Sequence, residues 1–201
     1  DLERALALLQ RALDLQPGRF ELCDPLVACH WALVEFEKSR GHDPEPRIRE
    51  ALKAIHPLAE RFPNLPDFQG YLGGLLVEQV DFQATHGQDP RPTAQRALSH
   101  LKRAIASAPS RFEFHFSLGN AHLALAQFQN LQGNSPDPDL HLAETAYEKA
   151  LVCNPRAHGA KLGLEEARWM RAQFLDAHDR DPRALLAQIE TNLPALLGPT
   201  G

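Results

Sequence analysis

Apolar residues along the chain are spaced three or four positions apart. Between residues 20 and 40 this spacing predicts one helix with a buried stripe, and between residues 44 and 62 it predicts a second. The first stripe is formed by Leu22, Leu26, Cys29, Leu33 and Phe36. The second is formed by Ile48, Leu52, Ile55, Leu58 and Phe62. No long segment alternates apolar and polar residues, so we expect no sheet.

The same pattern recurs every 46 residues. Proline marks the period most clearly, and leucine and phenylalanine repeat in columns of their own. The recurring positions include Pro17, Pro63, Pro109 and Pro155, then Pro44, Pro90, Pro136 and Pro182, then Leu26, Leu72, Leu118 and Leu164, and finally Phe36, Phe82, Phe128 and Phe174. A period of this length indicates a tandem array in which each unit is one helix hairpin.

Residues that end and begin helices recur at the same period. Gly41, Gly87 and Gly133 follow the first helix of a unit, where glycine enters the left-handed cap conformation freely. An aspartate or serine then precedes a proline, which is the pattern of an N-cap followed by the first helical residue. The pair Asp24-Pro25 predicts that the first helix of the first unit begins late, near Asp24.

These signals divide the chain into units of a single domain, residues 1–201, with about nine helices. Residues 1–17 match only the second helix of a unit, and four complete units follow at 18–63, 64–109, 110–155 and 156–201. Gly70, Gly73 and Gly74 fall inside a predicted first helix. We expect these glycines to let a neighbouring helix come close, and not to form a nucleotide-binding loop.

The second helix of a unit resembles the second half of a tetratricopeptide repeat (TPR). The resemblance is clearest at residues 143–155, AETAYEKALVCNP, where Tyr147 fills the space between small residues. The first helix resembles the family in the segment LGNAH at 118–122 and in LG at 72–73. The resemblance implies an all-α fold, a right-handed superhelical solenoid of antiparallel helix hairpins. Such a fold implies a protein-interaction module.

The unit is longer than the ordinary tetratricopeptide repeat of about 34 residues. This long form resembles the arrays that follow the catalytic domain in serine/threonine kinases of planctomycete-type bacteria. As an alternative function it implies the regulatory or sensor region of such a kinase. The chain itself contains no G-x-G-x-x-G loop, no H-R-D or D-F-G triplet and no Walker A sequence. We therefore expect this chain not to be an enzyme.

Composition narrows the possible partners. The chain is 43% hydrophobic with a net charge of -5, so it has the composition of a globular protein without a basic footprint for nucleic acid. No apolar run is long enough for a membrane span. The ten histidines show no H-E-x-x-H spacing, so we expect no metal ion and no cofactor. The three cysteines form no C-x-x-C pair, which favours reduced thiols and a cytoplasmic location.

The candidate binding site is the concave face that the first helices line in a helical array. One column of positions on these helices holds both tryptophans of the chain, which we expect to be partly exposed at two ends of one groove. The candidate contacts for a partner segment are Trp31, Val77, Phe116, Asn120, Leu123 and Trp169. Packing against adjacent helices is the other interpretation, and it is the stronger one for Val77 and Leu123. Acidic residues at neighbouring positions favour a basic or neutral segment.

Three functions follow from this architecture. The first is a non-catalytic scaffold that binds a protein or peptide partner, and the second is the kinase-associated region described above. The third is a self-associating array, for example a homodimer that forms through the terminal helices. In that hypothesis the apolar residues Ala5, Leu6 and Leu9, together with Leu13, need cover because the first helix lacks its hairpin partner.

Overall fold

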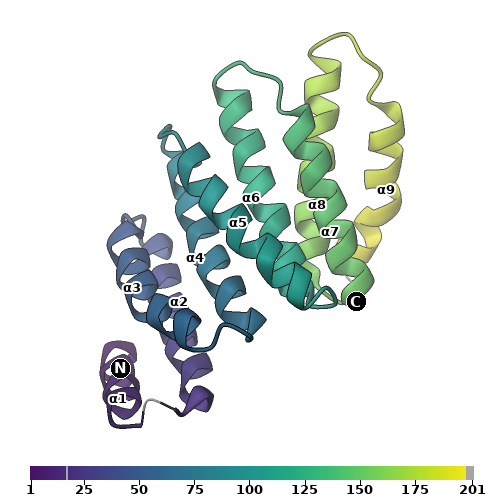
Figure 1. Cartoon of the computed structure of the whole chain (residues 1–201). Coiled ribbons are helices and arrows are strands. Elements are labelled where there is room, and N and C mark those ends of the chain that lie inside the picture. Colours follow the sequence, from purple (N-terminus) through teal and green to yellow (C-terminus); the bar gives the residue numbers. More distant parts are fainter. Residues whose placement is uncertain (17, 198–201) are drawn as a thin grey trace.

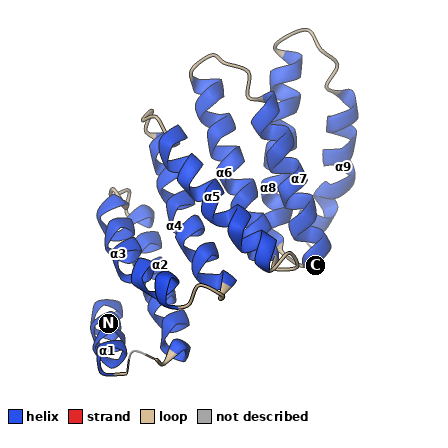
Figure 2. Ribbon diagram, in the orientation of Figure 1, coloured by secondary structure: helices blue, strands red, loops and turns tan. Residues whose placement is uncertain are grey.

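The protein is described by a computed structural model that covers residues 1–16 and 18–197, with side chains given for 1–16 and 18–192. Across these residues Figure 2 shows helices and loops only. In this part of the chain nine α-helices follow one another: α1 (Leu2–Leu15), α2 (Cys23–Ser39), α3 (Glu45–Arg61), α4 (Pro66–Thr85), α5 (Arg91–Ser107), α6 (Phe112–Leu131), α7 (Asp137–Cys153), α8 (His158–Asp176) and α9 (Arg183–Leu197). A short 3-10 helix, η1 (Phe20–Leu22), precedes α2. The predicted all-α architecture is confirmed.

The helices are stacked in chain order, from α1 at one end to α9 at the other (Figure 1). Consecutive helices pack as antiparallel neighbours, and the first helices of successive units also meet, α4 with α6 and α6 with α8. Helices α2 and α4 approach each other chiefly through side chains. The unit boundaries stay a prediction, and Pro17 and residues 198–201 lie outside the described residues. No described helix is long and apolar enough to cross a membrane.

The backbone repeats with the sequence at the ends of the first helices. Gly41, Gly87 and Gly133 have φ angles of 71°, 71° and 72°, as the cap prediction requires. The next N–H in each unit bonds a carbonyl five residues back, for example His42 N to Glu37 O at 3.0 Å, which completes a Schellman motif. Asp179 occupies the equivalent position after α8 with φ 54°, since aspartate tolerates this region better than most residues.

The starts of the second helices follow the prediction only in part, because Pro44 and Pro90, and not the aspartates before them, hold the N-cap positions of α3 and α5. The carboxylates of Asp43, Asp89 and Asp181 each accept the backbone N–H two residues later, at 2.8, 3.1 and 3.0 Å. These bonds satisfy one donor at the start of α3, of α5 and of α9. The late start of α2 is confirmed as well, because residues 20–22 form η1 and the α-helix begins at Cys23.

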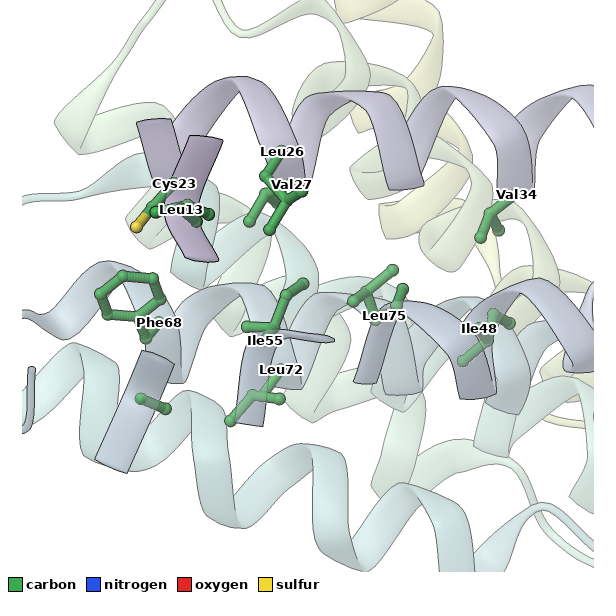
Figure 3. Packing of buried hydrophobic residues seen from close by; sticks show 12 residues of the cluster. Leu13, Cys23, Leu26, Val27, Val34, Ile48, Ile55, Phe68, Leu72 and Leu75 are labelled. Carbon is green, nitrogen blue, oxygen red and sulfur yellow. The ribbon is translucent and has the colours of Figure 1, made fainter. Parts of the chain in front are cut away.

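The core lies between the helices of each hairpin and the next hairpin. Figure 3 shows the cluster in which Leu26 and Val27 of α2 lie opposite Ile55 of α3 and Leu72 of α4. All four side chains are buried. The leucine column thus supplies a residue to the core in successive units, as the 46-residue period predicts.

The predicted stripe is wrong at Phe36, whose side chain is 49% exposed. Its counterpart Phe128 is buried, and the Arg91 guanidinium at the start of α5 lies 5.8 Å from its ring centre. Arg91 belongs to the second helix of the preceding unit. Phe36 also has a guanidinium near its ring, that of Arg40 at 5.5 Å. Phe128, unlike Phe36, is packed in a core cluster with Val80 of α4 and Ala94 of α5.

The expected lack of cover on α1 is also corrected. Leu13 is buried, and Leu6 and Leu9 pack against the core cluster of α2, α3 and α4. The most exposed leucines of this helix are instead Leu8 at 61% and Leu15 at 75%, and Leu2 is 40% exposed. The apolar stripe of α1 is thus covered in part within the chain because α2 packs directly on it, while Ala5, Leu6 and Leu9 stay partly exposed.

Candidate functional site

Two hollows lie along the first helices. The larger, of about 770 Å³, is lined by residues of α2, α4 and α6, and the smaller, of about 320 Å³, is lined mainly by residues of α4, α6 and α8. Both are lined by Val77, Glu78, Phe116 and Asn120. These four shared residues place the hollows side by side, and we call the two hollows together the first-helix groove.

The structure brings most of the predicted contact residues to this groove. Trp31, Val77, Phe116 and Asn120 line the larger hollow, and Leu123 lines the smaller. Trp169 lines neither. It lies instead at a separate hollow of about 160 Å³ that includes Pro182 and Leu186 at the α9 end. The expectation that the two tryptophans mark the ends of one groove therefore does not hold for Trp169.

Burial separates these residues into two groups. Trp169 is 51% exposed and Trp31 is partly buried, so the predicted partial exposure of both indoles is confirmed. Val77 and Leu123 are 3% and 7% exposed, which agrees with packing as their main role. Binding of a partner by any of the six residues stays a prediction.

Glycines shape the floor of the groove. A methyl group at Gly74 would lie 2.5 Å from Cη2 of Trp31, and one at Gly70 would lie 2.1 Å from the ring of Phe114. The equivalent distance from Gly73 to Leu101 is 2.6 Å. The expectation that these glycines admit a neighbouring helix is confirmed, because each receives a side chain from another helix.

Tyr147 of α7 is held between two further glycines. A methyl group at Gly119 of α6 would lie 2.6 Å from its ring, and one at Gly163 of α8 would lie 2.5 Å away. The ring is fully buried. This arrangement confirms that the tyrosine of the TPR-like segment fills the space between helices, and it fixes the distance between α6 and α8.

Tyr147 also orients a polar group of the groove. Its hydroxyl donates to Oδ1 of Asn120 at 2.8 Å. Burial, with the nearby carboxylates of Glu166 and Asp81, raises the pKa of Tyr147, so the hydroxyl stays a donor. With Oδ1 accepting this bond, Nδ2 is the remaining side-chain donor of Asn120, a residue that lines both hollows. The sequence predicted Asn120 as a contact, but nothing in it indicated a bond to a residue 27 positions away.

Lys38 is a charged residue of the groove that the sequence analysis did not predict. Its ammonium bonds the Glu78 carboxylate and lies 3.5 Å from Asp81 and 3.6 Å from Glu35. Burial lowers the pKa of Lys38, but the three carboxylates outweigh this effect and raise it. Burial raises the pKa of Glu78. One cation thus serves three carboxylates.

Glu166 is the acidic residue of the smaller hollow with the least compensation. Nε2 of Gln127 donates to its carboxylate at 3.2 Å, and no described cation lies within salt-bridge distance of it. Burial, followed by the repulsion of Asp81, raises the pKa of Glu166. The wall of the smaller hollow therefore carries negative charge that the chain itself does not neutralise.

Histidines of the first helices have structural partners. His122 Nδ1 lies 2.9 Å from the Asp139 carboxylate, and His115 Nε2 lies 2.8 Å from the Pro109 carbonyl. Among the side chains described, no group of three or more histidines, cysteines and acidic residues is placed to hold a metal ion.

The fold has a counterpart among solved structures. The sequence matches no protein-family model, and no curated protein matches it. The structure is similar to the crystal structure of TTC0263, a thermophilic TPR protein of Thermus thermophilus, with a TM-score of 0.51 and 20% sequence identity. The match covers 96% of this chain and 90% of that one. The chain thus has a TPR-like helical-repeat fold over nearly its whole length.

Proposed function

We propose that this chain is a non-catalytic scaffold that binds a segment of a partner protein in the first-helix groove. The observation that supports this function is that two neighbouring hollows share lining residues and together form the groove. The groove passes along α2, α4, α6 and α8 and combines an apolar floor with an oriented amide donor at Asn120. Aromatic side chains in such a hollow provide most of the binding energy in peptide interfaces.

The proposal is tested by selecting random 12-residue displayed peptides on the immobilised chain and measuring their affinity by fluorescence anisotropy. Ala28 is exposed and lines the larger hollow, so Ala28→Trp should fill the groove without removing a core residue. We expect this variant to weaken binding about tenfold or more, the effect of roughly 1.4 kcal/mol.

Ala106→Trp is the matched control, because Ala106 is an exposed alanine on the second helix α5. It should leave the affinity of the same peptides nearly unchanged. Peptides that bind equally well to the parent chain and to Ala28→Trp would place binding elsewhere and contradict the proposal. A selection that yields no peptide sensitive to Ala28→Trp would do the same.

The two alternative functions have their own tests. Association with a bacterial serine/threonine kinase rests on the resemblance of the long repeat, and the coding sequence on either side of this region tests it. Self-association would now depend on the exposed leucines of α1, Leu8 and Leu15. Light scattering of Leu8→Ser beside the parent chain tests it, since a dimer built on this face should dissociate in the variant.

A further inference from the structure

The walls of the first-helix groove carry an excess of acidic side chains. The residues that line its two hollows include the carboxylates of Asp24, Glu78, Asp81, Glu113 and Glu166, against the two cations Lys38 and Arg111. The formal charge of the groove lining is therefore -3. Over half of the net charge of the chain lies in this one feature, so the choice of occupant is strongly biased by charge.

The two cations of the groove are already engaged. Lys38 bonds Glu78, and Arg111 lies 2.8 Å from Asp67 and 3.3 Å from Glu113. Neither reaches Glu166, whose described polar partner is Gln127. In the smaller hollow Glu166 of α8 therefore has no cation beside it, and Asp81 of α4 shares Lys38 with Glu35 and Glu78.

Both carboxylates act on the same buried group. After burial, Glu166 and Asp81 are the causes that raise the pKa of Tyr147, and Asp81 also raises the pKa of Glu166. Asp81, Glu166 and Tyr147 all line the smaller hollow. A cation placed there would interact with both carboxylates and relieve their mutual repulsion.

We propose that the occupant of the groove is a basic peptide segment whose lysine or arginine lies between Asp81 and Glu166. Apolar side chains of the same segment pack in the larger hollow against Trp31 and Phe116, and Nδ2 of Asn120 donates to its backbone. This identity of the occupant rests on the proposed function of the groove. An acidic segment would meet like charge on both walls of the smaller hollow, which costs affinity.

The experiment uses three displayed libraries of 12-residue peptides built from Ala, Leu and Ser together with Lys, with Gln or with Glu. The best peptide of each library is labelled, and its dissociation constant is measured at low and at high salt. We expect the Lys peptides to bind most tightly and to weaken with salt, because an exposed charge pair is screened. We expect the Glu peptides to bind least.

Isosteric variants locate the charge effect. Asp81→Asn and Glu166→Gln each remove one negative charge of the smaller hollow, and each should weaken the Lys peptide roughly tenfold or more, the range for a lost charged hydrogen bond. Glu60→Gln removes the same charge from an exposed position on α3, 73% exposed and outside the groove, and should change the affinity little. Glu166→Lys should abolish the preference for Lys over Glu peptides.

The two proposals fail in different ways. The selected peptides could lose affinity in Ala28→Trp yet be neutral or acidic and bind Asp81→Asn and Glu166→Gln as well as the parent chain. That result overturns the basic occupant and leaves the scaffold function standing. Lys peptides equally weakened by Glu60→Gln would show a general charge effect and also overturn it. Peptides insensitive to Ala28→Trp overturn both.

Discussion

Trp31 and Trp169 occupy the same position in the first and the last unit, but their surroundings differ. The Trp31 ring lies over Gly74 of the next first helix, α4, and lines the groove. Trp169 on α8 is 51% exposed and lies beside residues of the α9 end. No described first helix follows α8, so Trp169 has no counterpart of Gly74 to cover it. A groove position is therefore a property of two adjacent units and not of one helix.

The centre of the stack shows the opposite extreme. Tyr147 has a first helix on each side, with Gly119 of α6 and Gly163 of α8 against its ring. It is fully buried, whereas the two tryptophans at the ends are partly or half exposed. We therefore expect an aromatic side chain to contribute more to the free energy of unfolding in the central units than at the ends.

The largest effect should come from Tyr147→Ala. Removing a large, fully buried aromatic side chain leaves a cavity and costs about 3–5 kcal/mol. Chemical denaturation followed by circular dichroism measures this loss in the free energy of unfolding. Leu142→Ala on the same helix is the control, since Leu142 is 47% exposed and should cost far less. Similar losses in both variants would remove the distinction between core and surface on α7.

Two glycine substitutions should have smaller effects on stability, and the loss should be greater at Gly119 beside Tyr147 than at Gly74 on the edge of the groove. Gly119→Ala places a methyl group against the Tyr147 ring, which Gly163 prevents from moving away, and should cost about 1–3 kcal/mol. Gly74→Ala meets only the outer edge of the Trp31 ring, which can swing into the groove. It should cost less, because the gain in helix propensity offsets part of the contact. Equal losses in denaturation experiments would show that both sites are equally rigid.

The two tryptophan substitutions should cause the smallest losses in stability. Trp31→Ala removes a partly buried ring that packs on α4 and should cost about 1–2 kcal/mol, below the range for fully buried aromatics. Trp169→Ala removes a half-exposed ring and should stay within about 0.5 kcal/mol, as surface substitutions usually do. Thermal melting followed by circular dichroism compares them. A larger loss for Trp169→Ala would mean that α8 and α9 depend on this ring.

The helix ends and the period were predictable because they depend on residues within one turn. Gly41 at a left-handed cap and Asp43 bonding the N–H of Glu45 are decided by the local chain, whatever packs around it. The burial of Leu26 followed from its helical spacing for a similar reason. These signals sufficed for the fold class and the helix boundaries.

The groove was only partly predictable because it depends on what the neighbouring units place against each position. The bond from Tyr147 to Asn120 spans 27 residues and that from Lys38 to Glu78 spans 40. In neither pair does the sequence around one residue indicate which residue it bonds. Trp31 and Trp169 share a column, yet only tertiary packing places Gly74 under one ring and leaves the other half exposed. Local sequence determines the face on which a side chain lies, and the next unit determines whether that face is core, groove or surface.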